Sequence, residues 1–272
     1  MTRPPSRAEE APEATVRIDT FGLRIGFRSN DASALRRVLR GLSSSWPAAG
    51  AGRLDRTYRI HVGRGRAPRL ALHCDQQLLG RTRGLERLAR WLEDHLHRYV
   101  AEQGPRRVFV HAGAVGWKGS AVLIPGRSYS GKSTLVAALV RAGADYISDE
   151  YAVLDRRGRV HPFPAPLSLR RGLATRRLTP EALGGRAASR PIPVGWILAT
   201  RYREGSRWRP RALTPGQAVL QLLAHTVPAR SRPAMALAAL RAAASRAKAV
   251  RSPRGEAGVV VDWLQISPGR RA

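Results

Sequence analysis

A glycine-rich segment at residues 126–133 has the residue types and spacing that bind a polyphosphate. Backbone N–H groups can curl around phosphate oxygens only where no side chain blocks them, and Gly126 and Gly131 meet that demand. Lys132 would neutralise the outer phosphates, and the Ser133 hydroxyl would bind a Mg²⁺ ion that also contacts them. The candidate nucleotide-binding residues are therefore Gly126, Arg127, Ser128, Tyr129, Ser130, Gly131, Lys132, Ser133 and Thr134.

Two adjacent carboxylates, Asp149 and Glu150, end a short apolar segment that contains Tyr146 and Ile147. Phosphoryl transfer requires a metal ligand and a base for the acceptor hydroxyl, and neighbouring acids can divide those tasks. We expect Asp149 to ligate the metal with Ser133, and Glu150 to act as the base. A second interpretation stays open, in which Asp149 holds the metal through water and Glu150 activates water for hydrolysis.

The segments beside the phosphate loop predict the strand and helix that such a loop needs. Residues 120–125 are a short apolar run, typical of a strand, and residues 133–140 predict a helix closed by Gly143. The N-terminus of this helix would point at the phosphates. His111 ends a second apolar strand pattern, where a histidine is more often structural than catalytic.

Four segments in this order resemble the catalytic domain of HPr kinase/phosphorylase: 109–115, the phosphate loop, 148–150 and 167–172. More specifically, they resemble the HPr-kinase-like serine kinases found beside lasso-peptide genes. The resemblance covers about residues 106–172. It implies an α/β P-loop nucleotide-binding domain of the HPr kinase / phosphoenolpyruvate carboxykinase-like type. It also implies Mg-ATP-dependent phosphorylation of a serine hydroxyl on a peptide or protein, with a ribosomally made (lasso-type) precursor peptide as the leading candidate.

The resemblance also assigns roles within the site. Lys132 and Ser133 would hold phosphates and Mg²⁺, with Asp149 as the metal-side carboxylate. Glu150 stands where the family has a second aspartate, the proposed general base. His111 matches the family's histidine, which could donate to the phosphoryl group or to the base.

One departure from the family lies in the segment 167–172. The family has a glutamate two residues before its arginine, whereas this chain has Ser168 ahead of Arg170. A hydroxyl coordinates Mg²⁺ more weakly than a carboxylate, so reverse phosphorolysis is not implied for this chain. Arg170 could still stabilise transition-state charge or bind a phosphorylated product, and otherwise it is a surface arginine.

The 272 residues predict two domains after a disordered start at 1–14. A small α+β N-terminal domain would span 15–104, with the join at Gly104–Pro105 and the ATP-binding catalytic domain at 105–272. Periodicity in the first domain predicts a hairpin, a helix with its core stripe, and further strands. These elements are the strands 15–18, 23–27, 58–62 and 70–74 and the helices 32–39 and 84–100. Cys74 should be a small core residue.

In the second domain, residues 151–154 and 159–163 predict a hairpin, and 196–202 predict a strand. Residues 176–193 are polar without clear period, and we expect a mobile segment that could cover a bound peptide. The remaining predictions are helices at 215–225 and 233–250, a strand at 258–263, and an edge hairpin around 207–209 with Trp208 buried.

The formal net charge of +29 is almost entirely due to arginine, since only three lysines occur. Such a charge attracts ATP and an acidic peptide substrate, and it is also a feature of nucleic-acid-binding proteins. We expect nucleic-acid binding to be the less favoured interpretation, because the densest stretch, residues 201–211, alternates as a solvated hairpin face does.

The chain lacks an apolar run long enough for a membrane span and an apolar secretion signal, so we expect a cytoplasmic protein without membrane contact. Two alternatives to a peptide kinase remain: a non-catalytic ATP-binding regulatory protein, and an HPr-type protein serine kinase in carbon regulation. The namesake enzyme forms hexamers, so a homo-oligomer is an open expectation.

Overall fold

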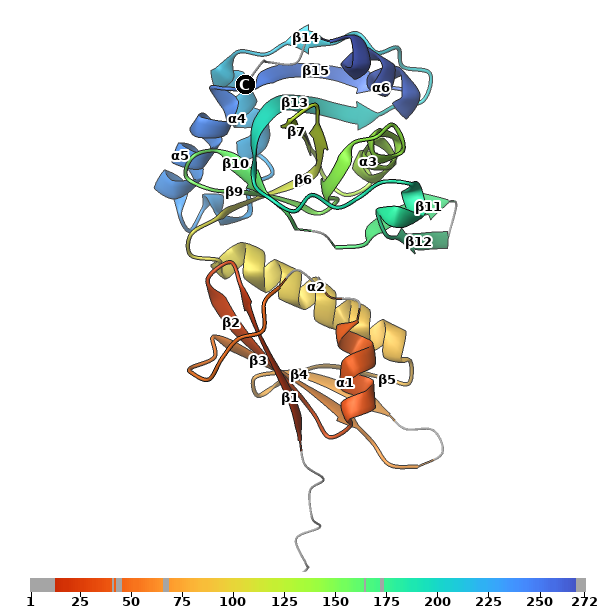
Figure 1. Cartoon of the computed structure of the whole chain (residues 1–272), viewed down its shortest axis with the longest axis vertical. Helices are drawn as coiled ribbons and strands as arrows, with labels where there is room; N and C mark the ends of the chain where they lie inside the picture. The colour runs from red at the N-terminus through yellow and green to blue at the C-terminus, as the bar shows by residue number, and fades with distance from the viewer. Residues whose placement is uncertain are drawn as a thin grey trace, which may run out of the picture. The chain divides into compact units, whose positions relative to one another are not determined.

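The computed structural model describes residues 13–40, 42, 46–65, 69–163, 165–171 and 174–267 of a mixed α/β protein. The chain divides into two compact units, Met1–Pro105 and Arg106–Ala272 (Figure 1). The start that we expected to be disordered lies outside the described residues as far as residue 12. No helix within the described ranges is both long and apolar enough to cross a membrane.

The first unit is a five-stranded sheet with two helices. Its strands follow one another in the order of the chain, and only β2 and β3 pair in parallel. The tight turn between the first two strands has left-handed backbone at Phe21 and Gly22, as a two-residue hairpin turn requires. The elements are β1 (Ala14–Thr20), β2 (Leu23–Ser29), α1 (Ala32–Leu39), β3 (Arg56–Val62), β4 (Leu70–Cys74), β5 (Gln77–Thr82) and α2 (Leu85–Gln103).

The apolar stripe predicted on α2 is confirmed as part of the core of the first unit. Leu88, Leu92 and Leu96 are completely buried at helical spacing, and Cys74 is buried as expected. On α1, the Asp31 carboxylate caps the helix by accepting a hydrogen bond of 2.9 Å from the backbone N–H of Ala34.

The second unit is built on an eight-stranded sheet with the order β10-β9-β6-β7-β13-β15-β14, in which β8 also pairs with β6. Its strands are β6 (Val108–Trp117), β7 (Ser120–Pro125), β8 (Asp145–Ser148), β9 (Tyr151–Leu154), β10 (Arg159–His161), β13 (Ile192–Tyr202), β14 (Arg211–Ala212) and β15 (Lys248–Arg254). Helices cover both faces of this sheet (Figure 1).

The helices α3 (Lys132–Arg141) and α6 (Ala257–Ile266) pack on one face, and α4 (Pro215–Leu223) and α5 (Pro233–Ala244) pack on the other. Along β7, Ala121 and Leu123 join the α4–α5 side of the core, whereas Val122 and Ile124 join the α3–α6 side. This two-sided burial explains why the strand before the phosphate loop is apolar at every position after Ser120.

The strands β7, β13 and β15 run parallel to one another in the centre of the sheet. Their carboxyl ends therefore meet at one edge, where open α/β sheets usually bind ligands. The phosphate loop leaves this edge from the end of β7 and leads directly into α3.

Two elements near the C-terminus differ from our predictions. Residues 258–263, expected as a strand, lie in the helix α6, and the helix expected over 233–250 ends at Ala244 and is followed by β15. The valine-rich α6 sequence favours a strand by propensity, yet Val260, Val261 and Leu264 are buried on the α3–α6 side of the core. Tertiary packing thus outweighed local preference.

The edge hairpin predicted around 207–209 is also wrong. Residues 203–210 contain no strand, and the short β14 that follows pairs with β15 instead. Arg207 and Arg209 are exposed as expected, whereas Trp208, which we expected to be buried, is half-buried with its ring 5.5 Å from that of Trp263.

The segment 176–193, expected to lack regular structure, begins within a second small sheet. The strands β11 (Leu167–Arg171) and β12 (Ala174–Leu178) form this antiparallel pair, and a 3-10 helix follows at Glu181–Leu183. Tyr146 of β8 then exchanges backbone hydrogen bonds of 2.8 and 2.7 Å with Arg186 and Ala188. These bonds tie the segment to the sheet that carries the acidic pair.

Candidate functional site

The loop between β7 and α3 contains two residues with left-handed backbone, a conformation found in the turns that cradle anions. Tyr129 and Gly131 are left-handed, with φ of 65° and 86°. A Cβ atom on Gly126 would lie 2.7 Å from Ser130 Oγ, and one on Gly131 would lie 2.7 Å from a guanidinium nitrogen of Arg254. The two glycines singled out from the motif are thus required by the space around them.

Lys132 is the first residue of α3, and only 7% of it is exposed. Its Nζ donates a hydrogen bond of 2.8 Å to the carbonyl oxygen of Arg127 across the loop. Burial lowers the pKa of this ammonium group, while Asp149 and Glu150 act in the opposite direction. The positive charge of Lys132 is therefore held inside the loop, near Asp149 and Glu150.

Ser133 and Asp149 lie in direct contact, as the sequence predicts for a shared metal site. The Ser133 hydroxyl donates to Asp149 Oδ2 at 2.9 Å, and the backbone N–H of Ser168 donates to the same oxygen at 3.3 Å. The other carboxylate oxygen, Oδ1, is buried and has no hydrogen-bond partner among the described residues. Burial is the main cause that raises the pKa of Asp149.

These residues fit a Mg²⁺ ion bound together with a nucleotide. A hydroxyl and a carboxylate are ligands that Mg²⁺ prefers, and an unpaired buried oxygen gains most from a cation. No group of three His, Cys, Asp or Glu side chains that could hold a metal by itself occurs in the described ranges. Mg²⁺ is usually bound by one or two protein ligands together with substrate phosphates, and Ser133 and Asp149 would match that arrangement.

We predict that Asp149→Asn stabilises the nucleotide-free protein. The pKa of Asp149 is raised, so its ionised form costs stability at neutral pH, and an amide removes that cost while still accepting from Ser133. The thermal midpoint should rise by about 2–4 °C for each kcal/mol recovered. The stabilisation that Mg-ATP gives the wild type, about 2.7 kcal/mol at a hundredfold excess over Kd, should be lost. Unchanged stabilisation by Mg-ATP in thermal unfolding would contradict the role of Asp149.

Glu150 lies between β8 and β9, next to Tyr151, which pairs with His111 of β6. The backbone N–H of Ala112 donates to the carbonyl oxygen of Glu150 at 3.2 Å, and the backbone N–H of Glu150 donates to Ser148 Oγ at 3.2 Å. His111 lies within β6 rather than at its end, because this strand continues to Trp117. The prediction that His111 ends its strand is therefore wrong.

The His111 imidazole is neutral at physiological pH. Burial and the nearby Lys132 charge lower its pKa to about 4, against an opposing contribution from Glu150. A neutral imidazole carries one N–H donor and one acceptor, so it can orient a phosphoryl oxygen or a carboxylate but adds no positive charge.

We predict that acid destabilises the protein through His111. Between pH 4 and 6.5 the unfolded imidazole is protonated while the folded one is not, so the free energy of unfolding rises with pH in this window and is level above it. A fully buried group with this pKa would contribute on the order of 3 kcal/mol, and solvent screening makes the contribution of the half-buried His111 smaller. His111→Asn should flatten this dependence in urea denaturation at several pH values. A variant with the wild-type slope would show that other groups cause it.

The hairpin β11–β12 carries the segment of the predicted arginine. Arg170 pairs with Thr175 in this hairpin, but its side chain lies outside the described part of the chain. Ser168 is exposed and contributes its backbone N–H to Asp149. Of the remaining loop residues, Arg127, Ser128, Tyr129 and Thr134 are exposed, whereas Ser130 is half-buried.

Sequence reasoning missed three residues that contact the phosphate loop or its histidine. Arg254 at the end of β15 is 1% exposed and donates to the carbonyl oxygen of Gly131 at 2.6 Å. The backbone N–H of Tyr202 donates to the Ser130 carbonyl oxygen at 2.8 Å. His225 accepts the backbone N–H of His111 at 2.8 Å through its carbonyl oxygen. The contacts of Arg254 and Tyr202 fix the loop to the ends of β15 and β13, which lie far away in sequence.

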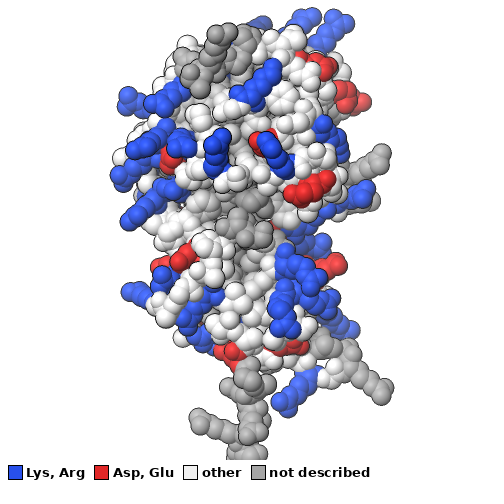
Figure 2. Space-filling model, viewed as in Figure 1, with Lys and Arg blue, Asp and Glu red and all other residues white. Residues whose placement is uncertain are grey.

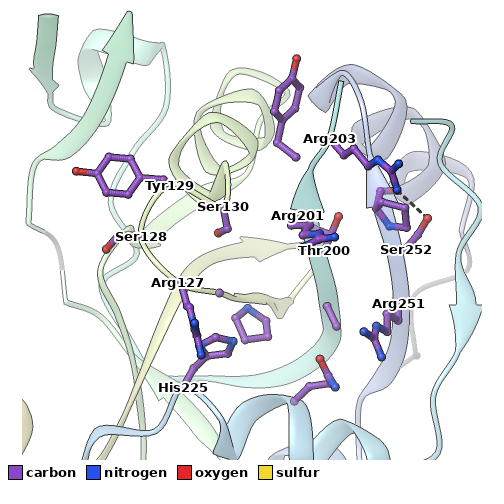
Figure 3. A pocket seen from close by; sticks show the side chains of 16 residues that line it. Arg127, Ser128, Tyr129, Ser130, Thr200, Arg201, Arg203, His225, Arg251 and Ser252 are labelled. Atoms are coloured by element: carbon purple, nitrogen blue, oxygen red, sulfur yellow. Dashed lines mark hydrogen bonds between the residues drawn. The ribbon is translucent and has the colours of Figure 1, made fainter. Parts of the chain in front are cut away.

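A cavity of about 870 Å³ opens beside the phosphate loop (Figure 3). Its walls are residues 125–130 of the loop, residues 199–203 at the end of β13 and residues 251–253 of β15, together with Gln221 and His225. The acidic pair Asp149 and Glu150 does not line it. The site thus has an acidic side, where Asp149 and Glu150 lie, and another side with this cavity.

Comparisons with known proteins give distant structural resemblance and no match in sequence. No family model matches the chain, and no curated protein matches it. Among solved structures, the chain is similar to the HPr(Ser) kinase/phosphatase from Coxiella burnetii, with 18% sequence identity and a TM-score of 0.35. The match covers 58% of this chain and 93% of that one. The resemblance to HPr kinase expected from the sequence thus stands only as a distant structural similarity.

Proposed function

We propose that this protein is a Mg-ATP-dependent kinase that phosphorylates a serine hydroxyl of a peptide or protein. The observation that carries the proposal is the hydrogen bond between Ser133 and Asp149, with Glu150 as the next residue. This contact brings two carboxylates to the N-terminus of the helix that follows the phosphate loop, where a bound terminal phosphate would lie. A lasso-type precursor peptide is the leading candidate for the acceptor.

The loop backbone and Lys132 would hold the triphosphate. Lys132 Nζ would exchange its hydrogen bond to the Arg127 carbonyl for bonds to phosphate oxygens. An ammonium group binds charged oxygens more strongly than it binds a neutral carbonyl. Ser133 and Asp149 would hold Mg²⁺, which supplies charge neutralisation at the phosphates when it is bound.

Glu150 would accept the proton of the acceptor serine as its oxygen forms a bond to the γ-phosphorus. The bond from that phosphorus to the bridging oxygen breaks, and ADP leaves with the electron pair. Neutral His111 would orient a phosphoryl oxygen or the Glu150 carboxylate through its N–H group. Hydrogen bonds of the Glu150 backbone with Ala112 and Ser148 limit the movement of this residue.

The direct test uses the full-length protein with Mg²⁺ and γ-labelled ATP against an array of peptides that each contain one serine. We expect label on the serine of a subset of peptides and none on matched peptides with alanine at that position. Release of labelled phosphate without labelled peptide would instead indicate hydrolysis. Binding of ATP with neither product would indicate a non-catalytic regulator. Selective labelling of HPr would indicate the HPr-type kinase.

A further inference from the structure

The cavity beside the phosphate loop carries positive charge from four separate arginines. Arg127 comes from the loop, Arg201 and Arg203 from the end of β13, and Arg251 from β15 (Figure 3). All four are exposed, and none of them forms an ion pair within the described ranges. No Asp or Glu residue lines the cavity. An anion that enters it therefore meets no opposing charge on its walls.

The strand register places two of these arginines side by side. Ala199 of β13 pairs with Arg251 of the parallel strand β15, and Arg201 follows Ala199 by two residues. Residues two apart in a strand share a face, so Arg201 and Arg251 are diagonal neighbours on the same side of the sheet. Like charges on diagonal neighbours repel each other, and an anionic ligand between them would relieve that repulsion.

The phosphates of a nucleotide do not need this second group of cations. The loop backbone, the N-terminus of α3 and Lys132 would supply the donors and the positive charge that a triphosphate requires. At about 870 Å³, the cavity lies near the upper end of the range of about 300–1,000 Å³ for ligand pockets. It has room for part of a second ligand beside a nucleotide.

The charge of the cavity is local and differs from the general surface charge. Lys and Arg side chains are scattered over the face shown in Figure 2 and are interspersed with neutral and acidic residues. In the cavity, by contrast, arginines gather without any acid. On the other side of the loop, Asp149 and Glu150 would repel an acidic acceptor. The site as a whole would thus orient such an acceptor with its carboxylates in the cavity.

We infer that the cavity lined by Arg127, Arg201, Arg203 and Arg251 binds carboxylate groups of an acidic polypeptide, the acceptor of phosphoryl transfer. The inference rests on the proposed function in calling this polypeptide the acceptor. Binding of the polypeptide can be measured without phosphoryl transfer. Guanidinium groups suit this role because they pair with carboxylates through two parallel hydrogen bonds.

The test measures peptide binding to the full-length protein by fluorescence anisotropy. The probe is a short labelled peptide in which glutamates flank a single serine, and its control has glutamines in their place. Arg201→Ala/Arg251→Ala should weaken binding of the glutamate peptide by about tenfold or more, since hydrogen bonds between charged groups are lost. Binding of a fluorescent ATP analogue with Mg²⁺ should be nearly unchanged.

The matched control is Arg190→Ala/Arg241→Ala, which removes the same charge from two exposed arginines outside the cavity. An equal loss of peptide affinity in this control would overturn the inference in favour of the general charge. In Arg201→Ala/Arg251→Ala, loss of ATP affinity with unchanged peptide affinity would also overturn the inference, because the cavity would then belong to the nucleotide. Unchanged affinity of this variant for both the peptide and the ATP analogue would overturn it as well.

A charge reversal gives a second, independent measurement. Arg201→Glu/Arg251→Glu should switch the preference of the protein from the glutamate peptide to a lysine-flanked one. A reversed variant that still prefers glutamates would overturn the inference. If the wild-type protein binds the glutamate peptide through these arginines but transfers no phosphate, the proposed kinase fails while the carboxylate site stands.

Discussion

Replacing Lys132 with methionine is expected to reduce phosphoryl transfer to a peptide serine by about 10²–10³-fold. Methionine fills the space of this buried side chain but removes the ammonium that donates to the Arg127 carbonyl and would contact the phosphates. Because the same charge would hold the triphosphate before transfer, the affinity for Mg-ATP should fall as well. Initial rates with γ-labelled ATP and equilibrium binding of a fluorescent analogue separate the two effects.

The matched control is Lys118→Met, which removes an equal charge from an exposed lysine of the same unit. Lys118 donates to the carbonyl oxygen of Gln265, away from the phosphate loop. The Lys118→Met variant should transfer phosphate at the wild-type rate. A Lys132→Met variant that is folded by circular dichroism and transfers phosphate at the wild-type rate would exclude the loop as the catalytic phosphate site.

Changing Glu150 to glutamine is expected to lower the transfer rate by about 10²–10⁴-fold while leaving the affinity for Mg-ATP nearly unchanged. An amide cannot take the proton of the serine hydroxyl, but it keeps the size of the side chain. The backbone contacts of Glu150 to Ala112 and Ser148 do not depend on the side chain. The loss should therefore lie in kcat, with a small change in the KM for ATP.

Glu181→Gln, an exposed position in the 3-10 helix of the same unit, serves as the control and should behave as the wild type. The experiment also separates the two interpretations of the acidic pair. If Glu150 activates water for hydrolysis, the wild type should release phosphate without labelling any peptide. Glu150→Gln should then lose this phosphate release. Equal transfer by Glu150→Gln and the wild type would remove Glu150 from the catalytic mechanism.

Local spacing was enough to find the phosphate loop, its flanking strand and helix, and the contact between Ser133 and Asp149. The loop depends on residues that are neighbours in sequence, such as Gly126 and Gly131, so its requirements are written in eight consecutive positions. The hairpin of β9 and β10 and the core stripe of α2 could be predicted for the same reason.

Predictions failed where packing between distant segments outweighs local preference. The valines of α6 favour a strand by propensity, and the alanine-rich run after residue 233 favours a helix that continues to 250. Neither preference includes the free energy of burying Val260 and Val261 on the sheet or of adding β15 beside β13. For β15, that free energy depends on its pairing with β13, whose residues lie more than fifty positions away along the chain.

The amino-acid sequence by itself determined which groups the glycine-rich loop brings together, because Gly126, Gly131, Lys132 and Ser133 belong to one continuous segment. Only the tertiary structure decided what surrounds it. Arg254 supports the loop, and the arginine-lined cavity exists, because β13 and β15 run parallel to β7 and end at the same edge. No local pattern specifies which strand ends become neighbours, since strand order follows from the packing of the whole sheet.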